Sequence, residues 1–399
     1  MTPSRVCMLV HHYFPRDVRV RREARALAAA GLEVTVLALR QPGEPARERF
    51  RGIEVVRLPV RRHRGSPLGV YLAEYTAFAA AAGMALRALC RRAPFDVVHV
   101  HTPPDFLVAA AGPARARGAR LVVDIHDLTP ELYGARFRGL GGRAASALLA
   151  RVEQRACRTA DRVLTATEAF RRLLIARGAE PARVQVLHNC PDEEIFDPAR
   201  LQALPPPPGD GPQVFRLVHH GTLVARYGLR TLLEAFARVA AARPEARLDV
   251  YGEGDLEPEL RLRAAEPPLA GRVRLLGDRP QDEVARAVLA ADLCVVPNLD
   301  DPFTDLLLPT KLIEALRLGR PAVASATTAV REAFPAGVRL VRPGDAGELA
   351  RAVLALMADD GARAALAAAG QREAERFAWR REKLKLLDLY RELGARRAG

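Results

Sequence analysis

Lys311 and Glu314 are the residues of this chain best suited to chemistry, because three positions apart they share one face of a predicted helix. Pro309 and Thr310 are favoured in the first turn of a helix, and Gly319 is a typical helix end. An ammonium in the first turn, beside free backbone N–H groups, suits an anionic ligand such as a diphosphate. An ionised carboxylate one turn later only accepts hydrogen bonds, so it suits the hydroxyl groups of a sugar. A phosphate next to a polyol indicates a nucleotide sugar.

The composition supports a specific role for Lys311. The chain has 61 Lys and Arg residues, and only Lys311, Lys383 and Lys385 are lysine. Arginine serves at the other basic positions, so the sequence predicts that this position requires a compact ammonium rather than a planar guanidinium. The alternative interpretation is an ordinary solvated charge on the helix surface.

The length of 399 residues predicts two domains of about 200 residues each. The five cysteines form no CxxC pair, which argues against a zinc site or a disulfide framework and for a reducing compartment. The apolar runs at 6–10 and 77–90 do not fit a signal peptide or a membrane span, the second because it contains Arg87. We therefore expect a cytoplasmic protein, with a peripheral position at the inner membrane face as a further hypothesis.

The net charge of +14 is uneven, since residues 1–100 contain 17 arginines and 8 acidic residues. Arg57, Arg61, Arg62 and Arg64 cluster in one stretch. Contact with anionic lipid headgroups and contact with nucleic acid are two interpretations, and an Arg-rich composition without a function is a third. The basic stretches lack interleaved aromatic residues and match no nucleic-acid motif, so they favour a membrane over nucleic acid.

Short apolar runs alternate with longer helical patterns along the chain. The predicted strands lie at 6–10, 34–39, 53–59, 97–101, 121–125, 162–165, 184–187, 215–219, 247–251, 273–276, 293–296, within 320–325 and at 338–341. The predicted helices lie at 20–30, 68–92, 106–117, 144–160, 168–177, 229–242, 256–265, 281–290, from 309 or 310 to 319, at 346–358 and at 377–393. This alternation predicts the α/β class, with parallel sheets that carry helices on both faces. The Pro-rich stretch 205–212 predicts a linker between a first domain, 1–204, and a second, 213–376. The helical tail, 377–399, is expected to cross back to the first domain.

The histidines follow the predicted strands. Eight of the nine lie at or near the carboxyl end of a strand: His11, His12, His99, His101, His126, His188, His219 and His220. In open doubly wound sheets, ligands bind outside those strand ends. Polar side chains at these ends in both domains therefore predict one crevice between two facing sheets.

Nearly the whole chain resembles glycosyltransferase family 4, whose members are retaining enzymes of the GT-B architecture. The stretches that carry the resemblance follow the family's order: HHYFPRDVRVRREARALAAAGLEVTVLA, VVDIHDLTPE, VLHNCPD, HHGTLVARYGLRTLLEAF, DVYGEGDLEPEL, VRLLG, AADLCVVPN, PTKLIEALRLGRPAVAS and FAWRREKLKLLDLYREL. The resemblance implies two facing Rossmann-like, doubly wound parallel-sheet domains with a cleft between them. The first domain would bind the acceptor and the second the nucleotide sugar.

At the donor helix, Glu314 matches the second glutamate of the family's Glu-x7-Glu motif, which holds the donor ribose. Leu306 stands in place of the first glutamate. Pro309, Lys311 and Glu314 instead match a P-x-K-x-x-E variant found in members that act in polysaccharide assembly. The resemblance implies that Lys311 binds the diphosphate and Glu314 the ribose, with Pro309 and Thr310 beside the donor.

The family's phosphate-binding Arg and Lys, which follow the first glycine of the second domain, are altered here. Gly221 is present, but Thr222 stands where Arg is usual and Tyr227 where Lys is usual. Arg226, one position earlier, is the candidate for the missing charge. With Lys311 it would offset the charge that grows on a departing nucleoside diphosphate.

Three further donor-side candidates come from the resemblance: Gly252 and Gly254 in the glycine loop, and Leu276 in a strand beside the nucleotide base. The two glycines lack the rest of a dinucleotide fingerprint, so an NAD site is a weak alternative. Residues 300–301 form an Asp-Asp pair that could bind a metal, but a Pro-containing surface loop is the better interpretation. With a helix N-terminus and basic side chains at the diphosphate, we expect neither a metal nor a cofactor.

On the acceptor side, Asp124 and His126 project to the same face of a predicted strand, and Asp127 follows. The family's histidine that matches His126 lies next to the transferred sugar, often through its backbone carbonyl. An ordinary strand-end histidine with a carboxylate neighbour is the alternative. Asp17 and Arg19 occupy a loop where the family often has glycines, and their charge predicts a contact with a phosphate-bearing acceptor or with the donor.

These residues predict a retaining, metal-independent transfer of a hexose from a UDP- or GDP-linked donor to a hydroxyl acceptor. The acceptor classes considered are a lipid-linked saccharide, a polysaccharide precursor and a small glycoside. We see no carboxylate pair placed for double displacement, so the resemblance implies front-face displacement assisted by the leaving phosphate. The alternatives are a nucleotide-sugar epimerase of the same fold and a non-catalytic basic protein that binds membrane or nucleic acid.

Overall fold

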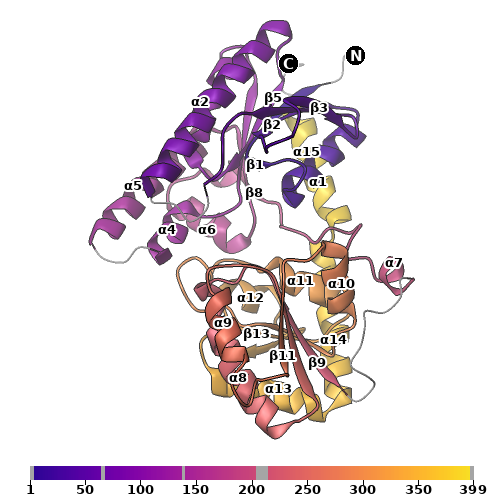
Figure 1. Ribbon diagram of the computed structural model, residues 1–399. Helices are drawn as coiled ribbons and strands as arrows, with labels where there is room; N and C mark the ends of the chain where they lie inside the picture. Colours follow the sequence, from indigo (N-terminus) through magenta and orange to yellow (C-terminus); the bar gives the residue numbers. More distant parts are fainter. Residues whose placement is uncertain (1–3, 64–67, 137–139, 204–213, 396–399) are drawn as a thin grey trace. The chain divides into compact units, whose positions relative to one another are not determined.

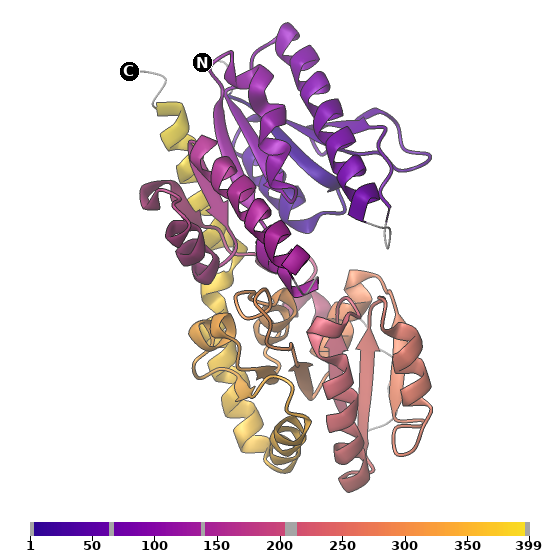
Figure 2. The ribbon, with the colours of Figure 1, turned by 90° about the vertical axis from the view of Figure 1, so that its left-hand side faces the viewer.

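The computed structural model describes residues 4–63, 68–136, 140–203 and 214–395 of the chain. They form two compact units, each with its own sheet (Figures 1 and 2). Unit 1 comprises Met1–Asn189 with Arg380–Gly399, and unit 2 comprises Cys190–Trp379. The linker predicted at 205–212 lies outside the described residues. Within the described ranges, no helix has both the length and the apolar character needed to cross a membrane.

Unit 1 is built on an eight-stranded sheet in the order β3-β4-β2-β1-β5-β6-β7-β8. Its strands are β1 (Arg5–Tyr13), β2 (Glu33–Leu39), β3 (Arg47–Phe50), β4 (Ile53–Leu58), β5 (Val97–Thr102), β6 (Arg120–Ile125), β7 (Arg162–Thr165) and β8 (Val184–Val186). All neighbouring strands pair in parallel except β3 and β4 at one edge. The central strands are almost wholly buried apolar runs, as a parallel sheet with helices on both faces requires.

The helices of unit 1 connect consecutive strands, except the C-terminal α15, which follows unit 2 in the chain. They are α1 (Val18–Ala29), α2 (Leu68–Arg92), the 3-10 segment η1 (Asp105–Ala111), α3 (Gly112–Arg115), α4 (Thr129–Arg136), α5 (Leu140–Thr159), α6 (Glu168–Ala176), the 3-10 turn η2 (Pro181–Arg183) and the C-terminal α15 (Trp379–Ala395). The hydroxyl of Tyr390 on α15 lies 2.9 Å from Nδ1 of the buried His99 on β5. Glu382 on the same helix accepts a 2.9 Å hydrogen bond from the backbone N–H of His188. The last helix, yellow in Figure 1, therefore packs against unit 1 although it follows unit 2 in the chain.

Unit 2 has a six-stranded parallel sheet in the order β11-β10-β9-β12-β13-β14. Its strands are β9 (Phe215–His220), β10 (Ala246–Tyr251), β11 (Val273–Gly277), β12 (Leu293–Val296), β13 (Ala322–Ser325) and β14 (Arg339–Val341). Its helices are α7 (Pro198–Gln202), η3 (Ala225–Tyr227), α8 (Leu229–Ala242), α9 (Glu257–Ala264), α10 (Gln281–Leu289), α11 (Thr310–Arg317), α12 (Thr328–Ala333), α13 (Ala346–Ala358), α14 (Asp360–Ala374) and η4 (Glu375–Phe377). Along β12, Leu293 and Val295 enter one hydrophobic core while Cys294 and Val296 enter the other. This alternation places one core on each face of the sheet.

The predicted α/β class with two doubly wound parallel sheets is confirmed. The helix predicted over 106–117 is instead the 3-10 segment η1 followed by α3. The prediction missed the edge strand β3, which has no fully buried residue, and the helices α4, α7, α12 and α14. Residues 190–203 were assigned to the first domain, but Phe196 and Leu201 lie in a core of unit 2.

Candidate functional site

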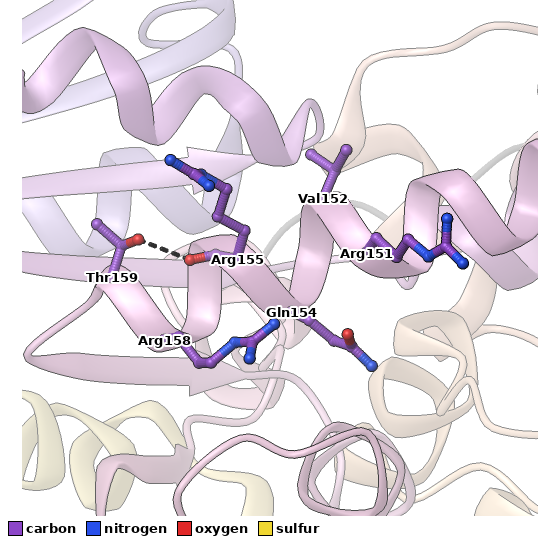
Figure 3. A pocket seen from close by; sticks show the side chains of 6 residues that line it. All are labelled: Arg151, Val152, Gln154, Arg155, Arg158 and Thr159. Carbon is purple, nitrogen blue, oxygen red and sulfur yellow. Dashed lines mark hydrogen bonds between the residues drawn. The ribbon is translucent and has the colours of Figure 1, made fainter.

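A surface hollow lies along α5 (Figure 3). Its described lining residues all belong to that one helix: Arg151, Val152, Gln154, Arg155, Arg158 and Thr159. None of them was predicted as a site residue. The sequence-predicted residues lie instead at the carboxyl ends of strands and at the start of α11, in two groups that are described separately for the two units.

In unit 2, α11 begins directly after Pro309, whose extended backbone forms the N-cap, and Thr310 is the first helical residue. Gly319 lies just beyond the helix with φ +67°, a left-handed conformation that glycine adopts without strain. Leu312, Ile313, Ala315 and Leu316 pack into the core. The predicted helix and the shared face of Lys311 and Glu314 are therefore present.

Lys311 is held in a confined space. A Cβ atom added to Gly221 would lie 2.8 Å from Nζ and 3.0 Å from Cε of Lys311, so a side chain at position 221 would force the ammonium to shift. Nζ also lies 4.7 Å from the centroid of the Tyr227 ring. Among the described residues, this buried Nζ has no hydrogen-bond partner. Burial lowers the pKa of Lys311 to about 8, and the carboxylate of Glu314 acts in the opposite direction.

A buried ammonium without a partner is costly, and oxygens of an anionic ligand would offset that cost. Tyr227 stands where the family has a lysine, and here its ring lies within cation–π distance of the Lys311 ammonium. The geometry fits a site in which Lys311 from α11 binds the diphosphate of the donor.

Glu314 lies one turn along the same helix. Its Oε2 is 3.6 Å from Nε2 of His220 at the end of β9, a distance longer than a hydrogen bond. Burial raises the pKa of Glu314 to about 7, opposed by Lys311 and reinforced by Asp192. Burial and the charge of Lys311 lower the pKa of His220 to about 3, so its ring is neutral. The contact with His220 was missed as a site feature, although the strand-end histidine pattern contained this residue.

Glycines allow two loops of unit 2 to approach each other beside Lys311. Gly252 has φ +122°, and a Cβ atom there would lie 2.0 Å from the carbonyl oxygen of Gly221. A Cβ atom at Gly254 would lie 2.4 Å from the carbonyl oxygen of Leu223. The loops are joined by the 2.8 Å hydrogen bond from Leu223 N–H to the carbonyl of Glu253. The predicted glycines thus serve close backbone approach, which is also how backbone reaches a phosphate.

The other donor-side candidates occupy neighbouring positions. Thr222 is exposed directly after Gly221. The guanidinium of Arg226 lies 5.6 Å from the centroid of the Phe303 ring, and one of its terminal nitrogens is buried without a partner among the described residues. Leu276 is half-buried in β11, next to Gly277, whose carbonyl accepts a 2.8 Å hydrogen bond from Gly252. All of these residues belong to unit 2.

Asp301 has a structural role in the loop before α11. Its Oδ1 accepts hydrogen bonds of 2.8 Å from the backbone N–H groups of Phe303 and Thr304. An aspartate that caps its own turn in this way is typical of a tight loop. The loop interpretation of this Asp-Asp pair therefore fits the structure better than the metal interpretation.

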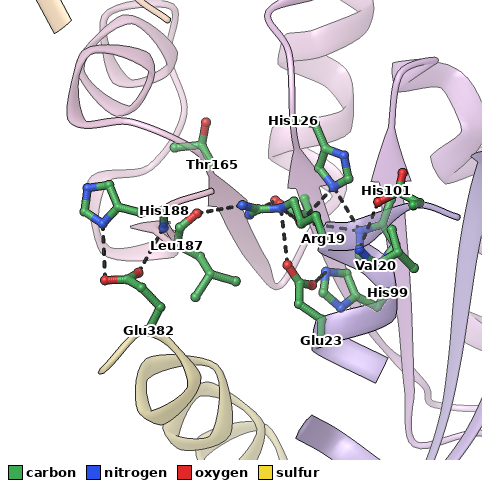
Figure 4. A network of polar contacts seen from close by, with 12 residues as sticks. Arg19, Val20, Glu23, His99, His101, His126, Thr165, Leu187, His188 and Glu382 are labelled. Carbon is green, nitrogen blue, oxygen red and sulfur yellow. Dashed lines mark hydrogen bonds and ion pairs between the residues drawn. The ribbon is translucent and has the colours of Figure 1, made fainter. Parts of the chain in front are cut away.

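In unit 1, the strand ends carry a buried polar network (Figure 4). Arg19 donates through Nε and Nη2 to the two oxygens of Asp124, at 2.7 and 2.8 Å, and through Nη1 to the carbonyl of Leu187, at 2.9 Å. Asp124 Oδ2 also lies 3.0 Å from Nε2 of His126. Arg19 is only 5% exposed. The prediction that this arginine contacts a phosphate is therefore corrected, because its N–H groups donate to Asp124 and Leu187 inside unit 1.

Asp17 and Asp127 flank this network. Asp17 is the N-cap of α1 and accepts a 3.0 Å hydrogen bond from the N–H of Val20. Burial tends to raise the pKa of Asp17, but His126 and the hydrogen bond from Val20 outweigh it, so the pKa is lowered. Asp127 is half-buried directly after His126. The structure thus brings the acceptor-side candidates together around one histidine.

Four buried residues of this network, Glu23, His99, His101 and Asp124, have ligand atoms within 4.8 Å of one another, as a metal site would. The guanidinium of Arg19 lies between them, 3.2 Å from Glu23 and 2.7 Å from Asp124. Burial, with Asp124 nearby, raises the pKa of Glu23 to about 8, so this acid is protonated at neutral pH. A fixed cation already compensates Asp124, so the donor set fits a hydrogen-bonded network better than a second cation.

The basic cluster near the start of the chain is only partly on the surface. Arg57 is 4% exposed and forms ion pairs with Glu44 and Glu48. Arg61 is exposed and Arg62 half-buried, whereas Arg64 lies outside the described residues. Arg57 is therefore a structural residue and is not available to a membrane or to nucleic acid.

Comparison with known proteins gives a consistent result over the whole chain. Residues 17–190 match the family model described as "Glycosyl transferase 4-like domain", and residues 214–359 match "Glycosyl transferases group 1". The chain is 31% identical over 397 residues to D-inositol 3-phosphate glycosyltransferase 1 of Catenulispora acidiphila, covering 94% of this chain and 90% of that one. It is 28% identical over 358 residues to the 2-deoxystreptamine glucosyltransferase of Streptomyces kanamyceticus, covering 86% and 89%.

Solved structures agree with the fold. Sucrose-phosphate synthase of Thermosynechococcus elongatus superposes with a TM-score of 0.76 at 22% identity, over 98% of this chain and 99% of that one. Anabaena HepE in complex with UDP-glucose superposes with a TM-score of 0.71 at 19% identity, over 97% and 99%. At such identities the likeness establishes the fold, which is GT-B.

Proposed function

The chain belongs to glycosyltransferase family 4, and from this premise we propose that it moves a hexose from a UDP- or GDP-linked donor to a hydroxyl acceptor. Transfer of a sugar from a nucleotide sugar follows from the family. The retained configuration, the hexose and the independence of metals and cofactors are our proposals. We further propose that the acceptor is a lipid-linked saccharide, a polysaccharide precursor or a small glycoside, and that the protein acts at the inner membrane face.

The buried ammonium of Lys311 is the observation that carries the proposal. It lies in the first turn of α11, where the positive end of the helix dipole also favours an anion. Glu314 on the same face would accept hydrogen bonds from the ribose hydroxyls. Arg226 would add a second positive charge at the diphosphate. These groups can stabilise a departing nucleoside diphosphate electrostatically, which is why we propose that no metal is needed.

Similar proteins support the substrate classes. HepE, which shares the fold, was solved with UDP-glucose, and two relatives are named for the acceptors D-inositol 3-phosphate and 2-deoxystreptamine. His126 would contact the transferred sugar from unit 1. Front-face displacement, with the leaving phosphate taking the acceptor proton, is the course we propose for the reaction.

Ligand binding and product analysis test the proposal. Thermal unfolding is measured with UDP, GDP, ADP and their sugars, because a ligand that binds only the folded state raises the melting temperature. The nucleotide sugar that stabilises the protein is then incubated with acceptors in the presence of EDTA, and the anomeric configuration of the product is read by NMR. An inverted product would contradict retention, and loss of transfer in EDTA would contradict metal independence. An epimerised sugar formed from the donor alone would indicate an epimerase.

The Glu314→Gln substitution is expected to weaken UDP binding about tenfold, because a charge-assisted hydrogen bond contributes roughly 1.5 kcal/mol or more. The 2′-deoxy and 3′-deoxy analogues of UDP should lose less affinity for the variant than UDP does. Isothermal titration calorimetry measures both values. Glu234→Gln, on the exposed surface of α8, is the control and should bind like the unaltered protein. Equal losses for UDP and both deoxy analogues would contradict a ribose contact.

The affinity for UDP is expected to fall on the alkaline side of pH 8. The pKa of Lys311 is lowered to about 8, so the free protein loses this charge as the pH rises above that value. Binding of an anion requires the proton, and the association constant should therefore fall about tenfold per pH unit above pH 8. Titrations at pH 7, 8, 9 and 10 at constant ionic strength measure the slope. The Lys311→Arg variant should lack this slope, and an unchanged affinity up to pH 10 would contradict a role for the ammonium.

A further inference from the structure

His126 is connected through its inner nitrogen to a buried charge pair. Its Nε2 lies 3.0 Å from Asp124 Oδ2 and 3.1 Å from Nδ1 of His101. Asp124 is fully buried, and Arg19 binds both of its oxygens. Arg19 is itself fixed to the carbonyl of Leu187. Figure 4 shows the Arg19 side chain between Leu187 on one side and His101 and His126 on the other. Buried hydrogen bonds from Arg19 thus fix Asp124, the group that contacts the imidazole of His126.

Among the described residues, the charged and titratable groups around His126 are those of this network, with Asp17 and Asp127 beside it. Asp124 is on β6 and His101 is on β5; Arg19 and Glu23 are on α1, and Asp17 is the N-cap of that helix. Burial lowers the pKa of His101, so its ring is neutral. The raised pKa of Glu23 keeps that acid neutral, so Asp124 is the ionised carboxylate nearest the ring.

We propose that Asp124, fixed by Arg19, is a positioning residue for His126: it accepts the Nε2–H of the ring and thereby turns Nδ1 towards an oxygen of the bound sugar, to which the protonated ring donates Nδ1–H. The inference rests on the proposed function, because the sugar is the ligand that His126 would meet. The inference goes beyond the proposed function because it assigns the contact with the sugar to the imidazole, held by Asp124, rather than to the backbone carbonyl of His126. Arg19, predicted as a ligand contact, becomes the residue that holds Asp124.

Physical chemistry favours this arrangement. A carboxylate that takes one ring N–H fixes the tautomer and orientation of a histidine and stabilises its protonated form. The Arg19 fork is suited to hold that carboxylate, because two parallel N–H groups match its two oxygens. Burial lowers the pKa of His126, but Asp124 more than compensates, and the pKa is raised above the ordinary value. In its protonated form, His126 donates from both ring nitrogens.

Nitrogen-15 NMR of the full-length chain labelled in histidine tests the inference without any substrate. We expect His126 to titrate above pH 6.5 and to carry its proton on Nε2 when neutral, with its signals assigned by their loss in His126→Gln. In Asp124→Asn the pKa should fall by at least about one unit, because the negative charge is gone. An Nδ1–H tautomer in the unaltered protein, or an unchanged pKa in Asp124→Asn, would overturn the proposal.

Kinetics and a matched control separate positioning from stability. The alkaline limb of kcat/KM should move to lower pH in Asp124→Asn by the same amount as the NMR pKa, while UDP affinity stays within about twofold. Asp249→Asn removes an equally buried carboxylate, bound by Arg216 and Arg274 in unit 2, and should leave the pH profile unchanged. If Asp124→Asn does not fold, the double variant Arg19→Met/Asp124→Leu removes both charges. The pKa of His126 should then fall by less than in Asp124→Asn, because Arg19, which lowers it, is removed as well, and an unchanged or raised pKa would overturn the proposal. Absence of transfer in the unaltered protein would refute the proposed function, while the NMR result would still decide the support of His126.

Discussion

The Lys311→Arg variant is expected to lose about 100-fold or more in kcat/KM for sugar transfer, although the positive charge is kept. The space around Nζ is the reason. Nζ lies so near Gly221 that a Cβ there would be 2.8 Å away, and it lies 4.7 Å from the Tyr227 ring centroid, so the larger, planar guanidinium would crowd the backbone at Gly221 or the Tyr227 ring. Lys311→Met, which removes the charge and keeps the length, should lose about 1000-fold.

Steady-state transfer and UDP titration measure these losses. Lys383→Arg, on α15, makes the same chemical change outside the donor site and should transfer sugar like the unaltered protein. If both Lys311 variants bind UDP with unaltered affinity, the diphosphate does not bind at this helix, and the donor site must be sought elsewhere in unit 2.

The Gly252→Ala variant is expected to lower the free energy of unfolding by about 2–4 kcal/mol and to weaken UDP binding. Gly252 has φ +122°, and an added Cβ would lie 2.0 Å from the carbonyl oxygen of Gly221 and 2.8 Å from its carbonyl carbon. Both neighbours are backbone atoms, so the loop after β9 must move, and it carries the glycine that leaves room for Lys311.

Urea denaturation followed by circular dichroism measures this loss. Gly271→Ala is the matched control, because Gly271 has φ +72° but no atom within 4 Å of an added Cβ. It should show only the cost of the backbone conformation, about 1–2 kcal/mol. Equal losses in the two variants would mean that the close approach of the two loops contributes nothing.

Local sequence signals predicted the elements that depend on local physics. The helix at Lys311 could be predicted because a first-turn Pro-Thr and a terminal glycine mark its ends. The 3-10 segment η1 over Asp105–Ala111 could not be predicted, because the tertiary setting decides between a 3-10 helix and an α-helix there. The strand β3 was missed because at the sheet edge its four residues show no apolar run.

The positions of individual side chains depended on contacts far apart in the chain. Arg19 was expected at a ligand because it lies in the first strand–helix loop region, but its partner Asp124 is 105 positions away. The contact between His220 and Glu314 likewise joins a strand end to a distant helix. Sequence patterns place such residues at the correct edge of a sheet, whereas only the packed structure decides which of them face each other.

The course of the last helix has a consequence for building hybrid enzymes from related sequences. Tyr390 and Glu382 complete contacts of His99 and His188, so α15 supplies part of the interior of unit 1. A chimera that exchanges residues 1–189 alone would pack the sheet of the related enzyme against α15 of this chain. The segments to exchange are therefore discontinuous in sequence. Residues 1–189 and 380–399 have to be taken from the same parent, and residues 190–379 can come from another.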